Sequence, residues 1–254
     1  MNNRHLKYTL LIGAALVLGA CSSSPDDEDI ALANQGPQML YDKAKENLAN
    51  GNFNGAAKTL STLDSRYPFG PYSHQVQLDL IYAYYKTNDQ DQALAAIDRF
   101  IRLNPNHSDV DYVYYMRGLV NMDAESNLFQ DLMGIDRADR DPTKSREAFN
   151  DFRQLIEKFP DSKYAPDAQK RMVYIKNRLA KYELAIARYY MKRQAYVAAA
   201  NRGKYVLENF QDTPHLQEAL ELMVECYEQL KLPELKEHTL RTLKLNFPNS
   251  QYTG

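Results

Sequence analysis

The spacing of small residues, large apolar residues and proline constrains the fold of this chain more than any other feature. Steps of four and three place side chains on one stripe of a helix. Proline then ends the helix, because the residue before it is pushed out of the α region. The pattern occurs three times in full, as Ala56, Leu60, Leu63 and Pro68, as Ala93, Ile97, Phe100 and Pro105, and as Ala148, Phe152, Leu155 and Pro160.

Two further copies of the pattern are weaker. One has Gln211 where proline is expected, and the other begins with Lys236 in place of a small residue. Their remaining positions are Ala199, Gly203 and Val206 in the first, and Leu240, Leu243 and Pro248 in the second. The lead positions 56 and 93 lie 37 residues apart, as do 199 and 236. Between 93 and 148 the sequence carries 18 extra residues, which fall near 126–143, and between 148 and 199 it carries 14 more.

A second helix-like segment precedes each stripe, which is the arrangement of tetratricopeptide repeats. One helix pair cannot bury its apolar face alone, so neighbouring pairs must stack into a superhelix. Strand signals are almost absent, and residues 167–194 contain neither proline nor glycine. The sequence predicts an all-α tetratricopeptide-repeat solenoid of five helix pairs, in which a long helix links repeats 1–3 to repeats 4–5. The alternative to a repeat fold is a set of generic amphipathic helices. Three complete copies of the spacing pattern, each with its proline, disfavour that alternative.

The first residues predict export and lipid attachment. Arg4 and Lys7 precede a thirteen-residue apolar run that is too short to span a bilayer, so we expect 1–20 to be a signal peptide. The run ends in Leu18-Gly19-Ala20-Cys21, which resembles a bacterial lipobox. That resemblance implies an acylated Cys21 and, with Ser22 next, the outer membrane; an ordinary signal peptide is the alternative. We expect residues 21–37 to form a disordered tether. Residues 38–166 are expected to form repeats 1–3 with the insert, and residues 167–254 the long helix and repeats 4–5.

Composition excludes several partners and functions. Without residues 1–20 the chain carries 29 basic and 33 acidic residues, with no basic stripe, so nucleic acid is not expected as a partner. If Cys21 is lipidated, Cys226 remains alone and no intramolecular disulfide can form. No other apolar stretch approaches the length of a membrane span.

Motifs for catalysis or metal binding are missing from the sequence. Its histidines are scattered, and no zinc-protease, phosphate-loop or serine-hydrolase motif occurs. Asp136, Asp139 and Asp141 lack the glycine turn and closing glutamate of a calcium loop. We therefore expect no enzyme activity, cofactor or metal. A periplasmic hydrolase would need a catalytic module for which no length remains.

Tyrosine is the unusual component, with nineteen residues and no tryptophan. In tetratricopeptide folds the first helix of each pair lines the inner groove, and tyrosine offers an apolar face with a polar tip for recognition. Such rings can equally belong to the core, as we expect for Tyr84 and Tyr114. The repeat alignment predicts a groove lined by Tyr41, Lys45, Leu78, Tyr82, Tyr85, Lys86, Tyr112 and Tyr115.

Several segments resemble one family closely. RYPFGPY at 66–72, QVQLDLIYAYY at 75–85, DRADRDP at 136–142 and RLAKYE at 178–183 are similar to the BamD (YfiO-like) lipoproteins of the bacterial β-barrel assembly machinery. The resemblance implies anchoring in the outer membrane, facing the periplasm, and a complex with BamA and accessory Bam lipoproteins. It further implies that the amino-terminal repeats receive carboxy-terminal signals of unfolded outer-membrane proteins. The carboxy-terminal repeats would then dock on BamA.

Asn201-Arg202 matches a motif of this family, whose arginine contacts an acidic group of BamA. The resemblance therefore implies that Arg202 is a docking residue, although a solvated helix arginine is the simpler interpretation of the residue alone. A different tetratricopeptide lipoprotein, an adaptor for cell-wall or division enzymes, is the alternative function. The YPFGPY segment and the interrupted third repeat argue against it. Whether the insert at 126–143 packs on the body or on a partner stays open.

Overall fold

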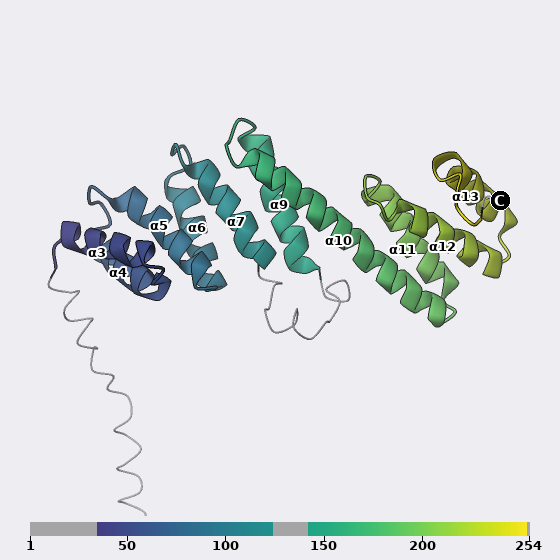
Figure 1. The fold of residues 1–254 in the computed structure, drawn as a ribbon, viewed down its shortest axis with the longest axis horizontal. Coiled ribbons are helices and arrows are strands. Elements are labelled where there is room, and N and C mark those ends of the chain that lie inside the picture. The colour runs from purple at the N-terminus through teal and green to yellow at the C-terminus, as the bar shows by residue number, and fades with distance from the viewer. Residues whose placement is uncertain (1–34, 124–141, 253–254) are drawn as a thin grey trace, which may run out of the picture. The chain divides into compact units, whose positions relative to one another are not determined.

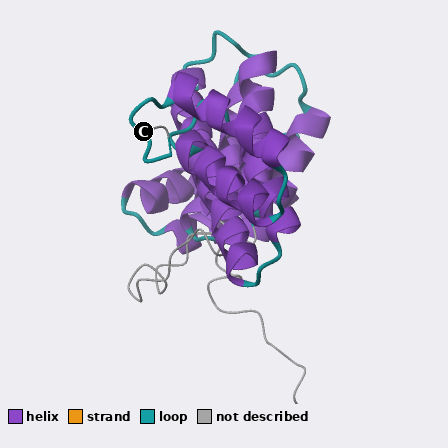
Figure 2. Ribbon diagram, turned by 90° about the vertical axis from the view of Figure 1, so that its right-hand side faces the viewer, coloured by secondary structure: helices purple, strands orange, loops and turns teal. Residues whose placement is uncertain are grey.

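The computed structural model describes residues 35–123 and 142–252, and within these ranges the chain consists of helices and connecting turns, with no strand (Figure 1; Figure 2). The helices follow one another as five pairs, with residues 124–141 falling inside the third pair. This confirms the predicted all-α repeat fold. The helices are α3 (Pro37–Ala49), α4 (Phe53–Arg66), α5 (Ser73–Lys86), α6 (Gln90–Leu103), α7 (Val110–Asp123), α9 (Thr143–Lys158), α10 (Ala165–Lys192), α11 (Tyr196–Asn209), α12 (Leu216–Gln229) and α13 (Pro233–Asn246).

The chain forms two compact units, which divide between Gln77 and Leu78 within α5. In the first unit α3 packs against α4, and Ala44 and Ala56 on these helices are fully buried. The side chain of Asn52 caps α4 by accepting a hydrogen bond from the backbone N–H of Gly55 at 3.1 Å. The second unit contains the remaining helices.

The second helix of each pair ends in the same backbone conformation. Tyr67, Asn104 and Phe159, each followed by the repeat proline, have φ of −131°, −131° and −134°. Phe210 has φ of −133° although Gln211 follows it. All four donate their backbone N–H to the carbonyl four residues earlier. The helix end therefore does not require proline, which explains why the fourth copy tolerates its loss.

The turn inside a helix pair has its own repeated geometry. Gly51, Asn88, Gln194 and Lys231 have φ of 72°, 56°, 58° and 56°, in the left-handed region. Gly51 and Asn88 lie 37 positions apart, as do Gln194 and Lys231, which is the spacing of the predicted repeat. Only the first turn uses glycine, the residue that adopts this conformation without steric cost.

The predicted stripes form the interior of the repeats. In the second unit Ile97, Phe100 and Phe152 are fully buried in one large core. Gly118 on α7 faces this core, and a Cβ atom there would lie 2.4 Å from Cε1 of Phe152. The small residue therefore lets the ring pack directly on the α7 backbone. In the fifth copy Leu243 is buried but Leu240 is only half-buried, so this stripe is the weakest.

Helix α10 links two cores within the second unit. Its 28 residues extend about 42 Å at 1.5 Å per residue, and it contacts α9, α11 and α12 (Figure 1). Ile175 and Leu184 belong to the large core, whereas Ala187 belongs to a smaller core with Cys226. This confirms the predicted long linking helix. It begins two residues earlier than expected, because a proline is tolerated in the first turn of a helix.

Several predictions concern residues beyond the part that the structure describes. The signal peptide at 1–20, the lipid attachment at Cys21, and most of the tether (21–37) and of the insert (126–143) lie outside it. The division into 38–166 and 167–254 stays a prediction. Within residues 35–123 and 142–252, no helix combines the length and the apolar character that crossing a bilayer requires.

Candidate functional site

In the first unit, the candidate groove residue Tyr41 stacks on another tyrosine. Its ring lies parallel to that of Tyr72, with centroids 4.7 Å apart and 9° between the planes. The Tyr72 hydroxyl donates to Oε1 of Gln38, which fixes the second ring. Lys45, one turn beyond Tyr41 on α3, is exposed. One face of Tyr41 is therefore covered by its own chain, and the half-buried ring is held rigidly.

In the second unit, α5 carries Tyr82, Tyr85 and Lys86 in two consecutive turns. Tyr82 is 38% exposed and Lys86 is exposed, whereas Leu78 is buried. The half-buried Tyr85 donates its hydroxyl to Oδ2 of Asp123 at 2.7 Å. Burial, together with this hydrogen bond to a carboxylate, raises the pKa of the Tyr85 hydroxyl. Tyr82 is thus the most accessible of the predicted groove tyrosines on this helix.

The two predicted tyrosines on α7 contact a third that the sequence analysis missed. Tyr164, in the turn before α10, stacks on Tyr115 with centroids 4.8 Å apart and 15° between the planes. It also contacts Tyr112, at 5.8 Å between centroids. Burial, followed by the proximity of Tyr164, raises the pKa of Tyr112. We call Tyr82, Tyr85, Tyr112, Tyr115 and Tyr164 the tyrosine cluster.

A repeat signal for Tyr164 was present in the sequence. Tyr164 lies four residues after Pro160, as Tyr72 lies four residues after Pro68. Each of these tyrosines stacks on a ring from the first helix of its repeat. The same structural element therefore occurs in repeats one and three.

Polar contacts hold the tyrosine cluster in place. The Tyr115 hydroxyl donates to Oδ2 of Asp167 at 2.5 Å, and Nε of Arg171 donates to the same oxygen at 2.5 Å. Hydrogen bonding from Tyr115, reinforced by Arg171, lowers the pKa of Asp167. Tyr114, by contrast, is buried on the opposite side of α7, as predicted, and Tyr84 is half-buried against the core.

The predicted docking residue Arg202 has an acidic partner within its own chain. Its Nη1 donates to Oε2 of Glu183 on α10 at 2.8 Å. Arg146 on α9 donates to the other oxygen of the same carboxylate at 3.1 Å. The Glu183 side chain is only 1% exposed, whereas Arg146 and Arg202 are 45% and 40% exposed. Hydrogen bonding to Glu183 raises the pKa of Arg202.

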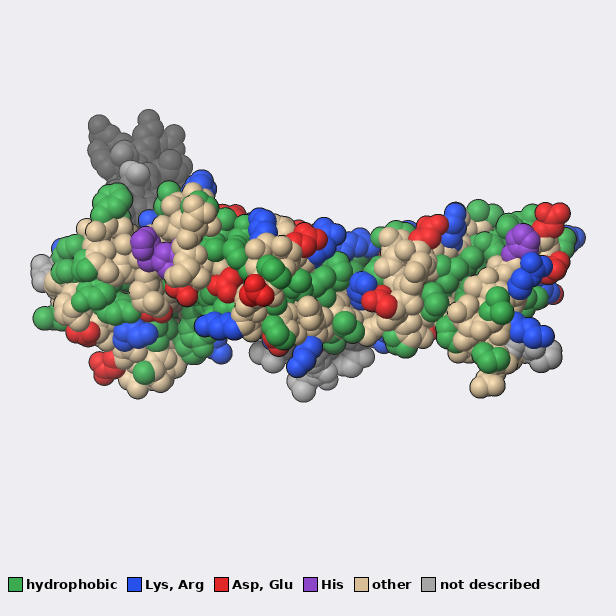
Figure 3. Space-filling view, turned by 90° about the horizontal axis from the view of Figure 1, so that it is seen from above, with side chains coloured by type: hydrophobic (Ala, Val, Ile, Leu, Met, Phe, Trp, Pro, Cys, Tyr) green, Lys and Arg blue, Asp and Glu red, His purple; other side chains and the backbone are tan. Residues whose placement is uncertain are grey.

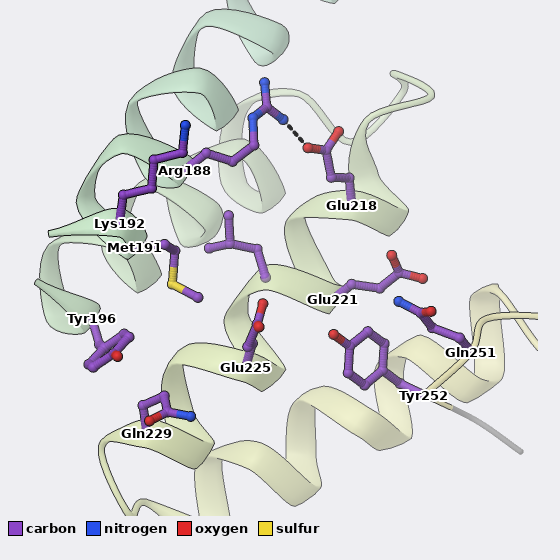
Figure 4. A pocket seen from close by; sticks show the side chains of 11 residues that line it. Arg188, Met191, Lys192, Tyr196, Glu218, Glu221, Glu225, Gln229, Gln251 and Tyr252 are labelled. Atoms are coloured by element: carbon purple, nitrogen blue, oxygen red, sulfur yellow. Dashed lines mark hydrogen bonds and ion pairs between the residues drawn. The ribbon is translucent and has the colours of Figure 1, made fainter. Parts of the chain in front are cut away.

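A cleft of about 570 Å³ lies among α10, α12 and the carboxy-terminal segment, and sequence reasoning did not predict it (Figure 4). Arg188 forms an ion pair with Glu218 across it, and Glu221 and Glu225 follow on the same face of α12. The Ser250 hydroxyl donates to Glu221 at 2.6 Å, which ties the chain end to the helix. Among the described residues, no group of histidine, cysteine and carboxylate side chains could hold a metal ion.

On the face drawn in Figure 3, basic and acidic side chains are interspersed, with apolar side chains between them.

The helix pairs, their repeated turns and the buried stripes define a tetratricopeptide-type solenoid, a class that presents helix faces for binding. The family described as outer membrane lipoprotein (YfiO) matches residues 33–243, and the chain belongs to this family. A relative from Vibrio cholerae, named outer membrane protein assembly factor BamD, is 47% identical over 95% of this chain and 99% of its own length. Proteins with the same name from Pasteurella multocida and Neisseria gonorrhoeae are 43% and 41% identical, covering 96% and 97% of this chain and 92% and 93% of their own lengths.

Proposed function

We propose that this chain is a non-enzymatic scaffold and substrate receptor in the assembly of outer-membrane β-barrel proteins. The observation that carries the proposal is the near full-length similarity to proteins named outer membrane protein assembly factor BamD. In this proposal Cys21 carries the lipid anchor in the outer membrane and the repeats face the periplasm. BamA, accessory Bam lipoproteins and unfolded outer-membrane proteins are the partners.

The tyrosine cluster of the second unit is one proposed binding surface for carboxy-terminal signals of these substrates, and Tyr41 with Lys45 of the first unit is a separate one. A barrel strand alternates apolar and polar side chains, so its apolar side chains can stack on tyrosine rings. On each of these surfaces a lysine, Lys86 in the second unit and Lys45 in the first, supplies positive charge for a terminal carboxylate. Tyr41 and Tyr115 each stack on another ring and Tyr112 contacts Tyr164, which supports rings held in fixed positions that lose little entropy on binding.

Site-specific crosslinking to a substrate peptide tests the tyrosine cluster. We expect Tyr82→Ala to reduce crosslinking strongly, because Tyr82 is the exposed member of the cluster. Tyr85→Phe keeps the aromatic ring but removes the hydroxyl that bonds to Asp123. It therefore distinguishes the contribution of the ring to crosslinking from that of the hydroxyl. Tyr174→Ala on α10 is the control, with 49% exposure outside the cluster. Equal crosslinking by Tyr82→Ala and by the control would exclude this binding surface.

Arg202 is the proposed contact for BamA. A guanidinium has five N–H donors in a planar fork, more than the bond to Glu183 uses, so it can also hold a partner carboxylate. Arg202→Glu should release the periplasmic domains of BamA in co-purification from solubilised outer membranes. A compensating acid-to-arginine change on BamA should restore binding. Co-purification at the wild-type level with Arg202→Glu would contradict the contact.

A further inference from the structure

A second cleft lies beside the Arg146–Glu183–Arg202 ion pairs. It has a volume of about 310 Å³ and is bounded by α9, α10 and α11. Phe149, Leu179, Tyr205 and Phe210 form its apolar part, and Arg146 and Lys176 its charged edge. We call this cleft the α9–α11 trough. Its size is at the lower end of ligand cavities and suits one or two side chains rather than a whole peptide.

Helix periodicity makes the trough continuous with Arg202. On α10, Leu179 and Glu183 are four residues apart and share one face. On α11, Arg202 and Tyr205 are three residues apart and also share a face. Arg146 belongs to both features, because it lines the trough and donates to Glu183. The two arginines therefore lie at one end of the apolar trough, above a common buried carboxylate.

The end of the trough formed by Arg146 and Arg202 carries a net positive charge. One buried carboxylate, Glu183, is shared by two guanidinium groups, which leaves one positive charge in excess. Both arginine side chains are more than one-third exposed, so their remaining donors are accessible to a partner. At the other end, Lys176 already pairs with Asp212, at 2.9 Å. A carboxylate would therefore be attracted to the arginine end in particular.

We propose that the α9–α11 trough docks a partner segment carrying a carboxylate beside an aromatic or aliphatic side chain. The carboxylate binds Arg146 and Arg202 together, and the apolar side chain enters among Phe149, Leu179 and Tyr205. This proposal rests on the proposed function, in which Arg202 contacts BamA. It adds a second arginine and an apolar pocket to that contact, and it specifies the chemistry that the partner must present.

Binding of purified periplasmic domains of BamA to the mature chain tests the trough. We expect Arg146→Gln and Tyr205→Ala each to weaken binding about tenfold, through loss of a charged donor and of apolar contact respectively. Asn150→Trp, at an exposed position on the rim, should block the trough and weaken binding as much. Arg241→Gln on α13 is the control, because Arg241 is 65% exposed, pairs with Glu237 at 3.1 Å and lies on a helix that does not line the trough.

The outcomes separate the two proposals. If the wild-type chain does not bind BamA, or Arg202→Glu binds as well as wild type, the proposed docking function fails. If Arg202→Glu weakens binding while Tyr205→Ala and Asn150→Trp bind as wild type, the trough proposal alone is overturned. Circular dichroism checks that each variant folds. If Arg146→Gln does not fold, the binding of Tyr205→Ala alone tests the trough proposal. Tyr205 is 39% exposed and contacts Phe210 with 5.8 Å between ring centroids, so its truncation removes this surface contact and no buried side chain.

Discussion

Tyr115 and Tyr164, 49 positions apart in the sequence, stack with ring centroids 4.8 Å apart. Tyr41 and Tyr72 stack in the same way at a separation of 31 positions. The difference of 18 equals the length of the insert in the third repeat. The two contacts are therefore the same repeat element, in which a tyrosine of the inter-repeat turn covers a tyrosine of the first helix. Such a ring pair presents a fixed aromatic surface.

The hydroxyl of Tyr115 should stabilise the start of α10 in a pH-dependent way. Tyr115→Phe removes the hydrogen bond to Asp167 and should lower the free energy of unfolding by about 1 kcal/mol at pH 7. The hydrogen bond lowers the pKa of Asp167, so its contribution is present above the unfolded value of about 3.9. This contribution to stability is lost as the pH falls through the pKa that Asp167 has in the folded protein.

Urea unfolding of wild type and Tyr115→Phe at neutral pH and at about pH 3 measures this effect. The difference between the two proteins should shrink at the acidic pH. Tyr174→Phe, with an exposed ring on α10, controls for loss of a hydroxyl as such. An equal deficit at both pH values would show that the ionised form of Asp167 is not responsible.

Glycine at the left-handed turns should stabilise the protein. Gln194 and Lys231 adopt φ of 58° and 56°, which costs an L-residue about 1–2 kcal/mol. Glycine removes this cost but increases the entropy of the unfolded chain, so Gln194→Gly should gain about 0.5 kcal/mol. Thermal denaturation measures the gain. Gly51→Ala should lose stability in the same assay, and a gain there would refute the explanation by backbone conformation.

Gly118 should not tolerate a methyl group. Gly118→Ala places Cβ 2.4 Å from the Phe152 ring, and the repacking should cost about 1–3 kcal/mol. Phe152→Leu removes the clashing ring atoms, so the double variant should lose less than the sum of the two single losses. Additive losses in this double-mutant cycle would indicate that the two sites do not interact.

Cys226 should be unreactive in the folded protein. It is fully buried, and burial raises the pKa of its thiol to about 11. Very little thiolate, the reactive form, therefore exists at pH 8. In a Cys21→Ser variant, where Cys226 is the remaining cysteine, iodoacetamide should label the protein only after unfolding in urea. Rapid labelling without urea would mean that the smaller core opens readily.

Local spacing made the helices and their repetition predictable. The intervals of four and three residues specify a buried stripe wherever the helix lies, so Ala93, Ile97 and Phe100 could be assigned to the core from the sequence. The uninterrupted stretch before Gln194 predicted α10, and the repeat length of 37 reappears in the structure as the spacing of the left-handed turns. Tyr82 and Tyr85 could likewise be placed on one helix face. These features depend on residues that are neighbours in the chain.

The pairing of side chains from different helices was decided only by the tertiary structure. Glu183 reads in the sequence as an ordinary helix glutamate, yet it is 1% exposed and bonded to Arg146 and Arg202, 37 and 19 positions away. Tyr164 similarly joins Tyr115 across 49 positions. Such contacts depend on how successive helix pairs rotate and pack, and small changes in that packing bring different faces together. The sequence by itself determined the repeat and its buried stripes, whereas helix packing decided which charges and rings meet.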